Sequence, residues 1–160
     1  MIVPDMIPNS AKIEGIIMAV FFLVVFISSF LAIYQISGWR NLSKGYPENL
    51  LQNPSKKFTW QSARIGWVNF NNCLTFSCSL SGFAIKMPNY LSFGFAKTIL
   101  IPWSDITWEK TSSWGLPHTS IKTTKLPNTK IIITQKQAEK IQKEQQKYSS
   151  IARPSNHENF

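Results

Sequence analysis

The sequence predicts a single N-terminal transmembrane α-helix followed by a mainly β domain, a barrel or sandwich of about seven strands, with one C-terminal α-helix. Three patterns carry this prediction. Residues 15–36 form an uncharged apolar run, residues 58–133 alternate between apolar and polar side chains, and residues 136–148 are rich in strong helix formers. A chain of 160 residues has room for one small domain besides the anchor, not for a multi-domain enzyme.

The apolar run is long enough to span a bilayer. As a helix, residues 15–36 would measure roughly 33 Å, against a hydrocarbon core of about 30 Å. Tyr34, Trp39 and Arg40 stand at its end, where aromatic and basic side chains anchor a span at the membrane interface. We therefore expect a short tail over residues 1–14 and a transmembrane helix after it.

A cleaved signal peptide is the main alternative to a retained span. Signal peptides have a basic start, an apolar stretch of about 7–15 residues and a small-residue cleavage site. Here residues 1–10 carry no basic side chain, the run is longer, and no Ala-x-Ala-like site follows it. A helix buried in a soluble core fits poorly with so long a run beside so little protein. We expect a retained single-pass anchor.

The charges that flank the run predict its orientation. Before it stands one basic residue, Lys12, together with Asp5 and Glu14. The basic residues within about 20 positions after it are Arg40, Lys44, Lys56 and Lys57. Because basic residues favour the cytoplasmic side, we expect the N-terminus outside and the larger domain in the cytoplasm, in an inner or plasma membrane. The reverse orientation is the alternative, since this asymmetry is modest.

Two further segments are expected to lie outside the folded domain. Gly45, Pro47 and Pro54 interrupt residues 37–56, which predicts a juxtamembrane linker with at most one helical turn. The polar residues 149–160 predict a disordered tail.

Residues 57–148 are expected to form the β domain with its C-terminal helix. Leu74, Phe76 and Cys78 alternate with polar residues and mark the clearest strand. The other strand candidates are 58–60, 65–67, 83–87, 90–95, 98–103, 106–108, 121–126 and 130–133. The change of phase between the first two of these indicates a bulge or a break. Turns are expected at Asn71–Asn72, Ser81–Gly82, Pro88–Asn89 and Pro127–Asn128, with a loop over 111–117.

These features resemble a known superfold. About seven strands closed off by one helix are similar to the pleckstrin-homology-like (PH-like) superfold. The stretches Leu80–Phe83 (LSGF) and Ile101–Ile106 (IPWSDI) resemble those of small bacterial membrane proteins with PH-like or GRAM-like domains. The resemblance covers residues 58–148 and implies a fold. It carries over no catalytic residues, because the members compared mostly lack an assigned activity.

The C-terminal helix carries the clearest candidate binding surface. Thr134 and Gln137 form a capping box at its start, and helix formers continue to about Tyr148. Its lysines, which at 100° per residue fall within a stripe of about 60°, are Lys136, Lys140, Lys143 and Lys147. The plainer interpretation is a solvated face supported by a pair between Glu139 and Lys143. The functional one is a site for anionic lipid headgroups or an acidic partner, enlarged by Lys122, Lys125 and Lys130.

No residue pattern in the sequence supports an enzyme, a cofactor or a metal site. Cys73 and Cys78 are five apart on one strand, so they face opposite sides about 16 Å apart and cannot form a disulfide. Asp105 and Glu109 would lie about 13 Å apart, too far to act on one bond. The two histidines lack further ligands at zinc-like spacing.

Composition and anchoring together predict a binding role. The net charge of +9 favours anionic partners. The expected membrane anchor raises the local concentration of the domain at the bilayer, so that even weak contacts are populated. We expect a membrane-anchored adaptor that contacts anionic lipid or a membrane-complex partner. The alternative is an accessory subunit whose helix packs beside other spans through Ser28 and Ser29. Nucleic acid is a weaker candidate, because no recognition motif accompanies the charge.

Overall fold

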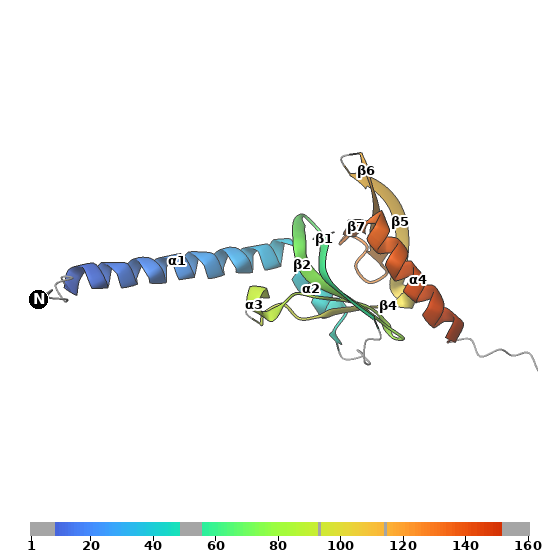
Figure 1. The fold of residues 1–160 in the computed structure, drawn as a ribbon, viewed down its shortest axis with the longest axis horizontal. Helices are drawn as coiled ribbons and strands as arrows, with labels where there is room; N and C mark the ends of the chain where they lie inside the picture. The colour runs from blue at the N-terminus through green and yellow to red at the C-terminus, as the bar shows by residue number, and fades with distance from the viewer. Residues whose placement is uncertain (1–8, 49–55, 93, 114, 152–160) are drawn as a thin grey trace, which may run out of the picture. The chain divides into compact units, whose positions relative to one another are not determined.

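The computed structural model describes residues 9–48, 56–92, 94–113 and 115–151. The chain divides between Ile33 and Tyr34 into two compact units. The first contains most of helix α1 (Asn9–Ile36), and the second contains a seven-stranded sheet with its helices. Figure 1 labels these elements along the chain.

Helix α1 has the length and surface expected of a membrane span. Among the described residues, one helical segment, Ala11–Ile36, is long and apolar enough to cross a membrane. Most of its large apolar side chains are exposed. The hydroxyl of Ser29 donates a hydrogen bond to the carbonyl of Val25 at 2.8 Å, so this polar group is satisfied within the helix. The helix begins at Asn9, so the end of the expected tail is helical; residues 1–8 lie outside the described part.

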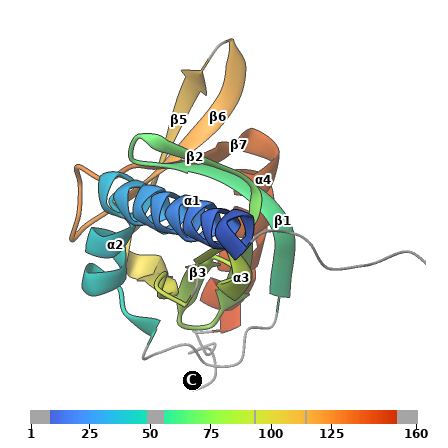
Figure 2. The ribbon, with the colours of Figure 1, turned by 90° about the vertical axis from the view of Figure 1, so that its left-hand side faces the viewer.

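The second unit is built on one antiparallel sheet with the strand order β4-β3-β2-β1-β7-β6-β5. The strands are β1 (Lys56–Ile65), β2 (Val68–Ser79), β3 (Gly82–Lys86), β4 (Ile99–Pro102), β5 (Ile106–Ser113), β6 (Leu116–Thr123) and β7 (Ile131–Thr134). The sheet curls into a half-barrel, and the β5–β6 hairpin projects beyond the other strands (Figures 1 and 2). The expected β architecture with one C-terminal helix is confirmed at this level.

Helix α4 (Gln135–Ile151) packs against the concave face of the half-barrel. Ala138, Ile141 and Tyr148 are buried, as the helical periodicity predicts. The Tyr148 ring stacks on Trp103 with 6.3 Å between centroids. Trp108 on β5 donates from Nε1 to the side chain of Gln145 at 2.9 Å. The helix therefore contacts both β5 and the segment that directly follows β4.

The capping box at the start of α4 is confirmed. The backbone N–H of Thr134 donates to Gln137 Oε1 at 3.0 Å, and the N–H of Gln137 donates to Thr134 Oγ1 at 3.4 Å. The helix continues to Ile151, three residues past the expected end, and residues 152–160 of the expected tail lie outside the described part.

The first hairpin differs from the sequence prediction. Its turn lies at Gly66–Trp67, where Gly66 has a φ of 56°, and not at Asn71–Asn72. Asn72 instead lies inside β2 with a φ of 49°, opposite an irregular stretch of β1, and its N–H donates to Ser62 Oγ at 2.8 Å. Asparagine tolerates this left-handed conformation, so its turn signal here marks a bulge.

Three smaller predictions were also wrong. The described residues of the expected strand 90–95, which are 90–92, 94 and 95, form no strand, because the backbone from Asn89 to Ser92 turns into the short helix α3 (Asn89–Ser92). The expected loop over 111–117 is a tight hairpin, in which Ser113 pairs with Leu116. The β2–β3 turn lies one residue earlier than expected, since Ser79 pairs with Gly82.

The expected linker over residues 37–56 is folded in its first part. Residues 39–45 form helix α2 (Trp39–Gly45), and the side chains of Trp39, Leu42 and Tyr46 are at most 1% exposed. The Tyr46 carbonyl accepts a hydrogen bond from the N–H of Leu100 on β4 at 3.1 Å. Residues 37–48 therefore belong to the β domain, while 49–55 lie outside the described residues.

Candidate functional site

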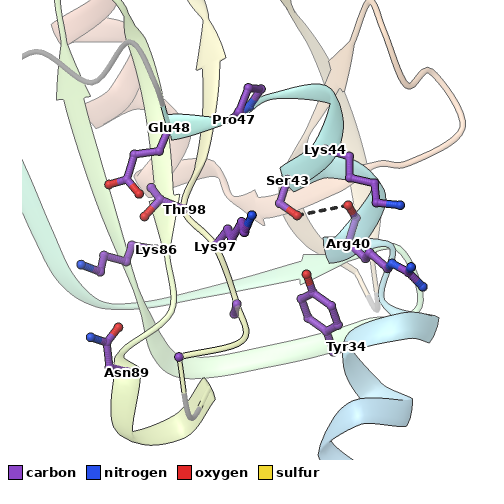
Figure 3. A pocket seen from close by; sticks show the side chains of 12 residues that line it. Tyr34, Arg40, Ser43, Lys44, Pro47, Glu48, Lys86, Asn89, Lys97 and Thr98 are labelled. Atoms are coloured by element: carbon purple, nitrogen blue, oxygen red, sulfur yellow. Dashed lines mark hydrogen bonds between the residues drawn. The ribbon is translucent and has the colours of Figure 1, made fainter.

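A cavity of about 640 Å³ lies where the chain leaves α1 and enters the β domain. Four basic side chains border it: Arg40, Lys44, Lys86 and Lys97. Figure 3 shows Arg40 and Lys44 on α2 at one side, Lys86 at the other, and the Tyr34 hydroxyl pointing between them. We call this region the basic cavity.

Helix α2 places two of the four basic groups. Arg40 and Lys44 are four residues apart, so they lie on the same face of the helix. Trp39 holds this helix in the domain: its ring packs edge-to-face on Phe70 with 5.6 Å between centroids. Its Nε1 donates to the carbonyl of Lys97 at 2.9 Å. One buried indole therefore connects both walls of the basic cavity.

The positive charge of the basic cavity is largely uncompensated. The guanidinium of Arg40 donates to the amide oxygen of Gln35 at 3.0 Å, which leaves its charge in place. Within the described residues, the ammonium groups of Lys44, Lys86 and Lys97 have neither an ion pair nor a hydrogen bond. Glu48 is the one acidic side chain at the border. Cationic groups around a concave surface concentrate a positive potential, so the basic cavity suits an anion.

The lysines of α4 are exposed, as expected, but form a separate surface. The α4 lysine stripe (Lys136, Lys140, Lys143 and Lys147) points away from the buried face of the helix. Glu139 accepts a hydrogen bond from the amide of Gln135 at 3.1 Å. The described residues contain no ion pair between Glu139 and Lys143, so the support expected for a solvated face is missing.

The lysines of the last hairpin do not extend this stripe. Lys122 forms an ion pair with Glu109 at 2.9 Å, and this contact lowers the pKa of the Glu109 carboxyl. The residue before it, Ile121, is fully buried, so Lys122 lies on the opposite face of β6 from this core side chain. Lys125 lies 5.1 Å over the ring of Tyr46, against the end of α2.

Lys130 borders a different cavity of about 400 Å³, together with Arg64, Trp67 and Asn128. The expected patch of seven lysines is therefore distributed over several surfaces.

The three expected interface anchors have different surroundings. Arg40 is exposed and Tyr34 is half-buried, and both border the basic cavity. Trp39 is fully buried. The assignment of Trp39 to the membrane interface was wrong, because its indole N–H is already bonded inside the domain.

The two cysteines are both free. Cys78 is fully buried, and burial, with a smaller contribution from Glu144, raises the pKa of its thiol to about 12. Cys73 is half-buried, and burial raises the pKa of this thiol as well. Both thiols therefore stay protonated at neutral pH, which disfavours nucleophilic chemistry. Among the described residues, no group of three His, Cys, Asp or Glu side chains is placed to hold a metal ion.

Sequence reasoning missed Lys86 and Lys97 as site residues. The available signal was their position: they flank a segment rich in apolar residues, MPNYLSFGFA, that contains no acidic residue.

No protein-family model matches the chain, and neither a curated protein nor a solved structure is significantly similar to it.

Proposed function

We propose that this protein is a membrane-anchored, non-enzymatic binding module. In this proposal α1 spans the membrane, and the β domain binds anionic lipid headgroups of the same bilayer. The basic cavity carries the proposal: Tyr34, in the last turn of α1, borders it together with four basic side chains. A headgroup at the membrane surface next to this turn would meet that charge.

The energetics favour a lipid surface over a free ligand. Each basic residue close to an anionic leaflet contributes about 1 kcal/mol. Such contacts are weak one by one, but a covalent anchor raises the local headgroup concentration enough to populate them. An acidic partner in the same membrane would use the same charges. The uncompensated ammonium groups of Lys44, Lys86 and Lys97 support either ligand.

We also propose that the domain has a PH-like fold, as in small bacterial membrane proteins with such domains. Seven strands curled into a half-barrel, with one C-terminal helix packed on the concave face, support this assignment.

The proposal makes a first prediction about lipid selectivity. The R40Q/K44Q/K86Q/K97Q variant of the full chain should lose its preference for phosphatidylglycerol over phosphatidylcholine by roughly tenfold or more, because four charges are removed from the basic cavity. Native mass spectrometry of protein–lipid complexes released from mixed nanodiscs measures this preference directly.

The matched control removes the same number of charges from α4. The K136Q/K140Q/K143Q/K147Q variant should keep the wild-type selectivity. Loss of selectivity in this control, with retention in the first variant, would assign the site to the α4 lysine stripe. Retention in both variants would contradict lipid binding by either surface.

A second prediction concerns orientation and retention of α1. We propose that the domain is cytoplasmic, because the basic residues follow the span. In a Cys73→Ser background, Ile2→Cys should react with a membrane-impermeant maleimide in intact cells, whereas Leu80→Cys should react only after lysis. The opposite pattern would reverse the orientation. An Ile2 label absent from the full-length band in lysed cells would indicate cleavage of the segment.

The accessory-subunit role is a second candidate. The exposed surface of α1 has a shallow depression bordered by residues that include the small side chains of Ala19 and Ser29. Small residues allow a second helix to approach closely in a membrane. The native mass spectra described above separate the two roles, because a subunit of an assembly would carry a protein of defined mass besides lipid.

A further inference from the structure

The connection between β3 and β4 exposes a group of large apolar side chains. Tyr90, Leu91 and Phe95 have 65%, 37% and 52% of their surface exposed. Single exposed apolar residues are common, but several within six positions form a patch that marks an interaction surface.

The fold holds these side chains outward. The N–H groups of Leu91 and Ser92 both donate to the carbonyl of Pro88 at 3.1 Å, and the N–H of Phe95 donates to the carbonyl of Ser92 at 2.8 Å. Ser92 is fully buried, and Met87 and Ala96 are almost fully buried. The connection is therefore anchored at both ends and in its middle, and its apolar side chains remain exposed.

A neighbouring tryptophan extends this surface. Trp60 and Tyr90 border a common cavity of about 170 Å³. Trp60 is 69% exposed and has a φ of 55°, a left-handed conformation that costs free energy for a bulky side chain. It lies in the irregular part of β1, so the bulge directs an aromatic ring toward solvent beside Tyr90.

The positive charges on either side of the patch favour a membrane interface as its partner. Lys86 and Lys97 bracket the connection, and both border the basic cavity. No acidic residue occurs from Lys86 to Thr98. Apolar side chains between lysines suit a membrane interface, where the rings reach the acyl boundary and the ammonium groups stay among the phosphates.

The position of the connection leads to the same partner. Asn89, Gly94 and Ala96 border the same cavity as Tyr34 in the last turn of α1. The apolar patch is therefore presented close to the point where the chain leaves the apolar helix.

We infer that Tyr90, Leu91 and Phe95 enter the interfacial layer of the leaflet next to which α1 ends, and so fix the domain against the bilayer. This inference rests on the proposed function, because it requires that α1 span the membrane. It adds a second kind of contact, apolar insertion, to the electrostatic contact of the basic cavity.

A fluorescence experiment on the full chain tests the insertion. In a Cys73→Ser background, Leu91→Cys is labelled with the fluorophore NBD and the protein is placed in nanodiscs. Cys78 is fully buried and does not compete for the label. Leu80→Cys is the matched control, because Leu80 is also an exposed leucine. Leu80 follows the C-terminal end of β2, about 36 Å along this strand from the Gly66–Trp67 turn at its N-terminal end.

We expect NBD at Leu91 to shift its emission to shorter wavelength and to be quenched several-fold more by nitroxide-labelled lipids than NBD at Leu80. Equal quenching at both positions, or none at either, overturns the inference. The lipid composition separates this inference from the proposed function. Quenching at Leu91 that is the same in phosphatidylcholine and phosphatidylglycerol discs supports insertion without the charge contact. Absence of quenching together with intact lipid selectivity leaves the basic cavity as the only contact and rejects insertion.

Discussion

The Trp39→Ala variant should lose about 3–5 kcal/mol of folding stability, a large part of the total for a domain of this size. The indole is fully buried, it packs on Phe70, and it donates a hydrogen bond to the Lys97 carbonyl. Its removal leaves a cavity in the core and takes away the donor that the part-buried Lys97 carbonyl accepts from. Urea unfolding of the full chain in a mild detergent, followed by circular dichroism, measures this loss.

Two further variants serve as controls for Trp39→Ala. Trp67→Ala removes a side chain that is 89% exposed and should change stability by about 0.5 kcal/mol or less. Trp39→Phe keeps most of the apolar volume and should show an intermediate loss, because the N–H donor is gone. Equal midpoints for Trp39→Ala and Trp67→Ala would mean that α2 is not part of the folded domain. Residues 37–48 would then be the linker that their composition suggests.

The features that the sequence predicts correctly depend on local periodicity. The buried residues Ala138, Ile141 and Tyr148 follow from helical spacing, and the clearest strand follows from the alternation around Phe76. The capping box at Thr134 also depends only on neighbouring residues. These patterns can be recognised in the sequence because the side chains that form each of them are only a few positions apart.

The features that the sequence misses depend on distant contacts. Helix α2 looks like a linker because it is short and followed by glycine and proline, yet Trp39 is bonded to a residue 58 positions later. The first turn was misplaced because Asn71–Asn72 is a stronger local signal than Gly66. Gly66 is required there by a close approach, since a Cβ at this position would lie 2.7 Å from the Ser37 carbonyl oxygen.

The basic cavity illustrates the same limit. Its four basic residues come from three segments. From the sequence, Arg40 was predicted as an interface anchor, and Arg40 and Lys44 as charges that flank the span, but none of the four was predicted as part of a cavity. The α4 lysine stripe was conspicuous because four lysines share one helix face. Regular spacing therefore revealed the α4 lysine stripe in the sequence. The basic cavity is formed by segments that are distant in the sequence, so no local pattern revealed it.

The Gly82→Ala variant should lose about 3 kcal/mol or more, because the position has no room for a side chain. A Cβ there would lie 2.2 Å from the carbonyl oxygen of Ile101 and 2.9 Å from the Cα of Pro102. Both are backbone atoms of the neighbouring strand, so no flexible side chain can move away. The same urea unfolding experiment measures the effect.

Gly115→Ala separates crowding from backbone conformation. Gly115 has a φ of 75°, but a Cβ there would meet no atom within 4 Å, so its loss should be about 1 kcal/mol. Similar losses for the two variants would contradict the close approach of β3 and β4. The difference is expected because Ile101 cannot retreat independently. It pairs with Phe83, and both side chains are fully buried in the core. Displacing this carbonyl would therefore open the strand pairing and the apolar packing together.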